Sequence, residues 1–172
     1  MRVSLMRYPS ESDWIICKEC ALVTVGLRTI NPPTGKWKRQ ILRARHSPIR
    51  ELKFIFFIED VPSYVATHLA RHIHAQPYIK SQRNDRQSDY DRNSARQDAP
   101  VNMMYSVNAE ELMTIANKRL CNLADQTTRK VVREMCICAS TNVPEIGEFL
   151  VPMCEHQGGQ CHEIYPCYKE EK

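Results

Sequence analysis

The sequence predicts a mixed α/β (α+β) fold in which a small antiparallel sheet packs on one long helix. Residues 52–59 are rich in Phe and Ile, which is typical of a buried strand. From Asn108 to about Ser140, apolar side chains recur at helical spacing, and Asn108-Ala-Glu-Glu111 resembles a capping box. We therefore expect a single helix of about 30 residues in this region.

The other predicted elements are short. Two runs, Trp14–Cys17 and Ala21–Val25, favour strands, and the basic residues 36–45 have the spacing of a short helix. A further helix is expected to begin at Pro62-Ser63 and to end near residue 76, because Pro77 cannot donate a helical hydrogen bond. A short helical piece should follow Pro144.

Residues 80–100 contain almost no apolar side chain. Such a segment is either a solvated linker or an ordered loop that grips a ligand. The sequence leaves both interpretations open.

The length of 172 residues suits one domain with one core. We expect residues 1–150 to form this domain and residues 151–172 to form a Cys-rich tail that is tied to Cys17 and Cys20. A formal net charge of +4 is too small to indicate a nucleic-acid partner. The chain has five glycines and neither GxGxxG nor GxxxxGK[ST], so side chains must hold any bound phosphate.

The first ten residues carry no apolar segment typical of a secretory signal, and no apolar run approaches the roughly 20 residues that a membrane span needs. Eight cysteines in such a chain are expected to be thiols or metal ligands before disulfides. We therefore expect a cytoplasmic protein without a membrane partner.

Basic side chains that suit a phosphate occur at intervals between residues 71 and 129. They are Arg71, His72, Arg83, Arg96 and Arg129. A guanidinium group matches phosphate oxygens with two parallel hydrogen bonds, so these residues could converge on a phosphorylated ligand. Alternatively, they form solvated or ion-paired faces.

The cysteine spacing raises the question of a structural zinc ion. Cys17-x-x-Cys20 is half of a zinc site, and Cys154 and Cys161 could supply the other half, with His162 and Cys167 as further candidates. Reduced thiols without metal and disulfides are the alternatives.

Other potential ligands lie on predicted helices. His68 and His72 are one helical turn apart, as in two-His metal sites, although HExxH is absent. Cys121, Cys136 and Cys138 are expected to pack into the core from the long helix. Neither a Ser-His-Asp order nor a pair of carboxylates in an apolar setting is visible, so an enzyme of this sequence would rely on a cofactor for its chemistry.

Several segments between residues 46 and 135 follow the order found in a known enzyme family. His46-Ser-Pro-Ile-Arg-Glu51 precedes the Phe-rich run, as a His-x-Ser-x-x-Glu segment does in that family. Arg71-His-Ile73 with Ser81-Gln-Arg83 is similar to its Arg-His-Arg and Ser-x-Arg motifs. Further matching segments are Ala95–Pro100, Asn108–Leu112, Asn117-Lys-Arg119 and Ala124–Arg129. Together these segments resemble the flavin-dependent thymidylate synthases.

The resemblance implies an α/β fold in a homotetramer that binds FAD and dUMP, a pyrimidine nucleotide, at its subunit interfaces. It also implies methylene transfer from methylenetetrahydrofolate to C5 of the uracil ring, with NADPH as the source of electrons.

The resemblance also implies roles for individual residues. The flavin would be bound by His46, Arg71, His72, Asn117 and Arg119, with the last two facing flavin or folate. Ser81, Arg83 and Arg96 would hold dUMP. Arg129 would polarise the pyrimidine ring, because a cation there stabilises negative charge as C5 becomes nucleophilic. Ser81 and Arg129 are thus the candidate catalytic residues.

Two departures from the family pattern leave other functions open. Ile73 stands where the family has its second Arg, and only twelve residues separate Arg83 from Arg96, where the family has a helical insertion. The alternatives are a nucleotide-binding relative that is non-catalytic or altered in specificity, and a zinc-stabilised interaction protein.

Overall fold

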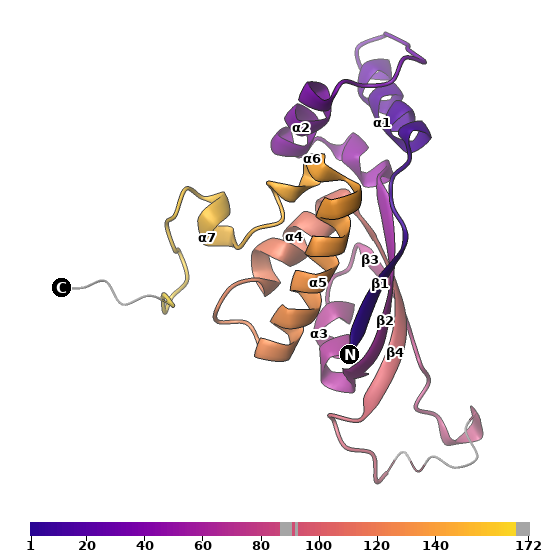
Figure 1. The fold of residues 1–172 in the computed structure, drawn as a ribbon, viewed down its shortest axis with the longest axis vertical. Helices are drawn as coiled ribbons and strands as arrows, with labels where there is room; N and C mark the ends of the chain where they lie inside the picture. Colours follow the sequence, from indigo (N-terminus) through magenta and orange to yellow (C-terminus); the bar gives the residue numbers. More distant parts are fainter. Residues whose placement is uncertain (87–90, 92, 168–172) are drawn as a thin grey trace, which may run out of the picture.

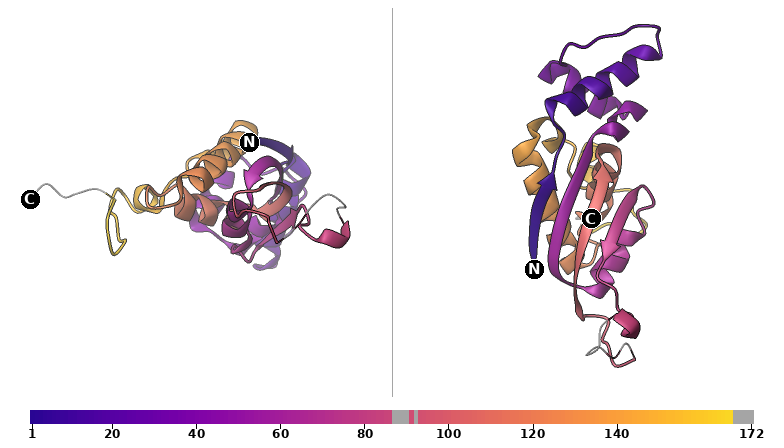
Figure 2. Two further views of the ribbon diagram at one scale, coloured as in Figure 1. Left: turned by 90° about the horizontal axis from the view of Figure 1, so that it is seen from below. Right: turned by 90° about the vertical axis from the view of Figure 1, so that its right-hand side faces the viewer.

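The computed structural model describes residues 1–86, 91 and 93–167. Its centre is a four-stranded antiparallel sheet with the strand order β1-β2-β4-β3. The strands are β1 (Arg2–Arg7), β2 (Lys53–Pro62), β3 (Ala75–Ile79) and β4 (Pro100–Asn108). Helices cover one face of this sheet, and the other face is open in the described part of the chain (Figures 1 and 2). The predicted α+β fold with a small antiparallel sheet is confirmed.

Alternation along the central strands explains why one face is buried. Phe54, Phe56 and Ile58 of β2 are fully buried beneath the helices, whereas Ile55 and Phe57 on the opposite face are half-buried. In β4, Val101, Met103, Tyr105 and Val107 are buried at the same period of two. This second alternation is a strand signal that our sequence analysis missed.

The predicted single long helix is wrong, because the structure has two helices there. These are α4 (Ala109–Arg119) and α5 (Gln126–Asn142), separated by a turn over residues 120–125. Asp125 caps α5 by accepting a hydrogen bond from the Thr128 amide at 2.8 Å, so a new helix begins where periodicity alone continued the old one. Leu123, which fits the helical spacing, is exposed in the turn.

The N-terminal prediction is also wrong. Trp14–Cys17 and most of Ala21–Val25 lie in α1 (Glu11–Val23), preceded by the unpredicted strand β1. Ser10 and Asp13 form a reciprocal capping box that starts α1, and this local signal overrides the β-branched side chains that follow. The basic helix is confirmed as α2 (Gly35–Ala44), and a 3₁₀ turn, η1 (Ser47–Glu51), leads into β2.

The helix after β2, α3 (Ser63–Ala70), is shorter than predicted. Residues 75–79 pair with β4 as β3 instead of extending α3. Pro77 is tolerated because β3 is an edge strand with only one neighbour.

The described residues of the polar segment (residues 80–99) lie beyond the end of the sheet opposite α1 and α2 (Figure 1). It contains a short 3₁₀ turn, η2 (Asn84–Arg86), and residues 87–90 and 92 lie outside the described structure. The expected helical piece after Pro144 is confirmed as α6 (Pro144–Gly147), and α7 (Met153–His156) follows in the tail. Among the described residues, no helix is both long and apolar enough to cross a membrane.

Candidate functional site

A buried polar cluster lies where the end of α3 meets α4. His72 Nδ1 lies 3.0 Å from Glu111 Oε1, and Arg119 Nε donates to His72 Nε2 at 3.2 Å. The His72 and Glu111 side chains are only 10% and 9% exposed. Because Arg119 can only donate, His72 Nε2 must accept, and the ring proton therefore lies on Nδ1 and points to the Glu111 carboxylate.

Burial lowers the pKa of His72 below its ordinary value, and the positive charge of Arg119 adds to this effect, while Glu111 opposes it. The imidazole is therefore neutral at pH 7. The buried Tyr105 donates a hydrogen bond from its hydroxyl to Leu69 O, at the end of α3, at 3.0 Å. Burial raises the pKa of Tyr105, so this hydroxyl stays protonated.

Glu111 is a functional candidate that the sequence analysis treated only as part of a helix start. Asn108 does cap the Glu111 amide at 2.9 Å, as predicted. The Glu111 carboxylate, however, binds His72 rather than the backbone of the cap residue. The capping-box pattern in the sequence therefore did not predict that the Glu111 carboxylate contacts His72.

His68 links α3 to the beginning of α5. Its Nδ1 lies 2.8 Å from Thr128 Oγ1, and the Thr128 hydroxyl donates to Asp125 at 2.9 Å. Arg119 also donates to the His68 carbonyl at 3.1 Å. Although His68 and His72 are one turn apart, they face different partners, so the structure does not assemble them as a metal pair.

Arg71, the residue after α3, lines a polar hollow beside this helix. The hollow has a volume of about 290 Å³ and is lined by Ser63, Tyr64, Thr67, His68, Arg71 and Gln97. Ser63 Oγ donates to Gln97 O at 2.6 Å, which fastens the end of the polar segment to the start of α3. One short helix thus brings together the Arg71 hollow, the buried cluster and the start of α5.

The two predicted phosphate-binding arginines of the polar segment are paired locally. Arg83 makes two hydrogen bonds to Asp85, at 2.9 and 2.6 Å, and Arg96 makes two to Asp98, at 2.9 and 3.0 Å. Both guanidinium groups are exposed, Arg96 by 82%. The Ser81 hydroxyl accepts from the Arg83 amide at 3.3 Å. The structure therefore shows the ion-paired alternative for both arginines and does not bring them to Arg71.

Asn117 is fully buried, and both ends of its amide are occupied. Its Oδ1 accepts a hydrogen bond from Arg45, and its Nδ2 donates to Val151 O at 2.7 Å. Burial lowers the pKa of Arg45, and its Nε is buried without a hydrogen-bond partner. Arg45 was not among the predicted site residues, because its left-handed backbone (φ 50°) and burial have no signal in the basic run that contains it.

The remaining predicted residues lie apart from one another. His46 lines a separate hollow of about 600 Å³ beside Cys20. Arg129, on the first turns of α5, donates to Asn122 Oδ1 at 3.0 Å.

The predicted zinc tetrad of Cys17, Cys20, Cys154 and Cys161 is not assembled. Cys17 is buried in the core from α1, where burial raises its thiol pKa to about 12 and disfavours the thiolate that a metal needs. Cys154 and Cys161 line a different hollow from the one that Cys20 lines. Among the described residues, no three His, Cys, Asp or Glu side chains stand in position to hold a metal ion.

Cys136 is core-facing, as predicted, and burial raises its thiol pKa to about 12. Cys138 is half-buried and packs against the core. The prediction for Cys121 is wrong, because this residue lies in the turn after α4 and lines the hollow beside the tail.

No family model matches the sequence, and no curated protein matches it significantly. Solved structures do match the fold. A flavin-dependent thymidylate synthase ThyX from Helicobacter pylori, complexed with FAD and dUMP, is 15% identical with a TM-score of 0.69 over 88% of this chain and 100% of its own. A second ThyX structure from that organism, with FAD and dUMP, has a TM-score of 0.66 at 15% identity over 90% of this chain and 99% of its own.

A third matching structure is a UMP/dUMP methylase PolB from Streptomyces cacaoi bound with 5-Br dUMP. It has a TM-score of 0.68 at 15% identity and covers 86% of this chain and 93% of its own. Each of the three likenesses covers at least 86% of this chain. The chain therefore has the fold of the flavin-dependent thymidylate synthases.

Proposed function

We propose that this chain is a flavin-dependent enzyme that alkylates a pyrimidine deoxynucleotide such as dUMP at C5. FAD would be its cofactor, with methylenetetrahydrofolate and NADPH as co-substrates. The observation that carries the proposal is the buried His72–Glu111–Arg119 cluster beside the Arg71 hollow, on a fold shared with proteins complexed with FAD and dUMP.

The residues around α3 fit an anionic, hydrogen-bonding cofactor such as FAD. Arg71 offers an exposed cation, and Ser63, Thr67 and His68 add polar groups in the same hollow. His72 and Arg119 would contact the bound flavin, and His46 and Asn117 would make further contacts with it. When bound, FAD supplies the electron-transfer chemistry. The hollow is at the small end of the roughly 300–1,000 Å³ typical of ligand pockets, so we propose that other subunits complete it.

The nucleotide would be held by side chains of the polar segment. Arg83 and Arg96 would bind its phosphate and Ser81 would position it, as bidentate guanidinium groups and a hydroxyl can do. Arg129 would lie beside the pyrimidine and stabilise negative charge on the ring as C5 attacks the one-carbon unit. The Asp partners of both arginines would have to release them first.

We further propose a homotetramer, because one face of the sheet is not covered by helices in the described structure. Ile55, Phe57 and Met104 are half-buried there, and Tyr78 of β3 is exposed. Burying such a face between subunits would remove apolar surface from water. Light scattering of the purified chain would test this proposal, since a monomer at micromolar concentration contradicts it.

Flavin titration tests the proposed function most directly. We expect the protein to quench FAD fluorescence to saturation at one equivalent per chain, and Arg71→Ala to weaken this binding. Arg39→Ala is the matched control, because Arg39 is an exposed arginine on α2. A protein that takes up no flavin, with or without dUMP, overturns the proposal.

A second candidate function is a nucleotide-binding protein without flavin chemistry. It is favoured by Ile73, which is 81% exposed at the position of the family's second Arg. Calorimetry separates the two functions: dUMP binding without FAD binding supports the second, and no nucleotide binding contradicts it. Ile73→Arg should then raise FAD affinity, because the exposed position accepts a cation without disturbing the core.

A further inference from the structure

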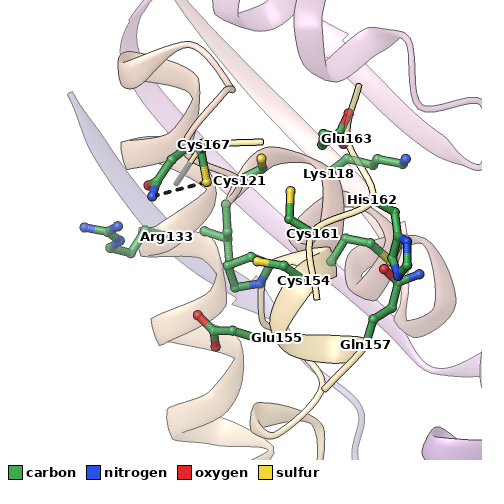
Figure 3. A pocket seen from close by; sticks show the side chains of 14 residues that line it. Lys118, Cys121, Arg133, Cys154, Glu155, Gln157, Cys161, His162, Glu163 and Cys167 are labelled. Atoms are coloured by element: carbon green, nitrogen blue, oxygen red, sulfur yellow. Dashed lines mark hydrogen bonds between the residues drawn. The ribbon is translucent and has the colours of Figure 1, made fainter. Parts of the chain in front are cut away.

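The C-terminal tail and the α4–α5 turn enclose a hollow that is rich in thiols. Its volume is about 420 Å³, and its lining includes Cys121, Cys154, Cys161 and Cys167. Figure 3 shows that these four side chains gather around one space between the turn and α7. Four of the eight cysteines of the chain therefore lie around one hollow that contains none of the proposed flavin or nucleotide residues.

Specific backbone features bring these distant cysteines together. The tail begins at Val151, whose carbonyl is held by Asn117 of α4 at 2.7 Å. After Cys154 on α7, Gly158 and Gly159 adopt φ values of 76° and 95°, and the Gly159 amide donates to Cys154 O at 2.8 Å. Only glycine adopts such a pair readily, and the resulting turn directs the chain back toward the hollow.

Cys167, the last described residue of the tail, lies beside the α4–α5 turn. Asn122, next to Cys121, has its Nδ2 4.0 Å from Cys167 Sγ (Figure 3, dashed line). One cysteine of the turn and three cysteines of the tail, at spacings Cys-x₆-Cys-x₅-Cys, are thus neighbours.

Apolar packing does not explain why the tail takes this course. Ile164 and Tyr165, its large apolar side chains between Cys161 and Cys167, are both exposed. In contrast, Cys17 and Cys136 are packing cysteines inside the core. A short segment that buries so little apolar surface usually needs a cross-link or a metal to hold it.

We propose that Cys121, Cys154, Cys161 and Cys167 bind one Zn²⁺ ion that fastens the tail to the α4–α5 turn. Four thiolates are a common ligand set of structural zinc, and binding releases their protons. Because no three described ligand side chains stand at ligating positions, binding includes rotation of the cysteine side chains and closure of the tail around the ion.

The charges around the hollow are compatible with this ligand set. Zn²⁺ with four thiolates carries a net charge of about −2. Lys118 and Arg133 line the hollow and offset this charge, whereas Glu155 and Glu163 add to it. These two cations and two carboxylates balance one another, so the surroundings carry no net charge from these four side chains. The inference is independent of the proposed function, since it assigns no role to flavin or nucleotide.

Metal titration of the full chain under reducing conditions tests the proposal. The protein is stripped with a chelator and titrated with Zn²⁺, and Co²⁺ serves as a coloured probe of tetrahedral thiolate ligation. We expect one equivalent of either ion. Loss of outer-shell partners already lowers metal affinity by about 10–100-fold, so Cys161→Ser should lower it by at least about a hundredfold.

Cys20→Ser is the matched control, because Cys20 lies on α1 beside a different hollow. Circular dichroism of each variant verifies that the core is folded, which is expected because Cys161 lies in the tail. The proposal is overturned if Cys20→Ser abolishes zinc binding and Cys161→Ser does not. It is also overturned by zinc below half an equivalent, or by mass spectrometry that finds disulfides among these four cysteines in the protein as isolated.

Discussion

The two groups of basic residues in the proposed flavin and nucleotide sites differ in their burial and in their hydrogen-bond partners. At the α3–α4 junction, Arg119 and His72 are bound in a buried network with Glu111. In the polar segment, Arg83 and Arg96 are exposed, and each is paired with an aspartate two residues along the chain. The first group is hydrogen-bonded within the fold, whereas the second would have to exchange a carboxylate for the phosphate of the proposed nucleotide.

Because of this difference, we expect substitutions in the first group to change mainly the stability of the fold, and substitutions in the second group to change mainly the affinity for a ligand. Removing one member of a buried hydrogen-bonded network leaves its partners without hydrogen bonds, which costs more than breaking an exposed ion pair. Changes at the junction should therefore alter the free energy of unfolding. Changes in the polar segment should alter nucleotide binding and leave stability nearly untouched.

The largest effect is expected for Glu111→Ala. This change removes the carboxylate that accepts from the neutral His72 ring and leaves a buried donor unsatisfied, so the free energy of unfolding should fall by about 3 kcal/mol. Urea denaturation measures this loss. Glu110→Ala is the control, because Glu110 pairs with the exposed Arg50. If Glu110→Ala lowered the free energy of unfolding as much as Glu111→Ala, the proposed difference between buried and exposed groups would be wrong.

The next effect is on the nucleotide. Arg83→Ala should weaken dUMP binding about ten- to a hundredfold, because charged hydrogen bonds to the phosphate are lost. The urea midpoint should not change, since the Arg83 guanidinium is exposed and binds its exposed neighbour Asp85. Arg86→Ala, an exposed arginine on η2, is the control, and calorimetry should show wild-type affinity for it.

A smaller effect is expected from pH. Because burial lowers the pKa of His72 below 6.5, the unfolded chain binds the proton more readily than the folded one. The contribution of His72 to stability is therefore fully present above pH 6.5 and is lost as the pH falls through the folded pKa. Urea unfolding at several pH values should show this loss, and His72→Gln should flatten it. An unchanged slope in His72→Gln would assign the pH dependence to other groups.

The smallest effect is expected when an aspartate partner is neutralised. Asp85→Asn or Asp98→Asn should raise dUMP affinity by about threefold or less, because exposed ion pairs are weak competitors. The gain should shrink at high salt, since screening weakens the same pairs in the wild type. Weaker binding in both variants would mean that the aspartates position the arginines for the ligand.

Local and periodic signals account for the parts of the fold that the sequence predicted. Residues 52–59 predicted β2 because they are rich in Phe and Ile, and the basic run predicted α2 because its apolar side chains have helical spacing. The split between α4 and α5 was not predictable from period alone, since α4 ends at Arg119 and Asp125 caps the start of a second helix. Strand β3 contains Pro77 and forms through its pairing with β4, which is a tertiary effect.

The candidate site was predicted less completely than the fold. Arg71, His72 and Arg119 were named, and the structure joins the last two, but Glu111 and Arg45 were missed. Glu111 is buried and Arg45 is half-buried, and the hydrogen-bond partners of both lie far away in sequence. The zinc prediction failed for the same reason, because a CxxC pair contains no information about which hollow it faces.

The contact between α5 and β1 has a consequence for the order in which the chain can fold. Val3 and Leu5 of β1 pack against the core, and α5, which begins at Gln126, contacts this strand. During synthesis the first strand therefore leaves the ribosome long before its cover exists. Contacts of such large sequence separation form late and slowly, so the apolar side of β1 remains open to a chaperone until most of the chain has been made.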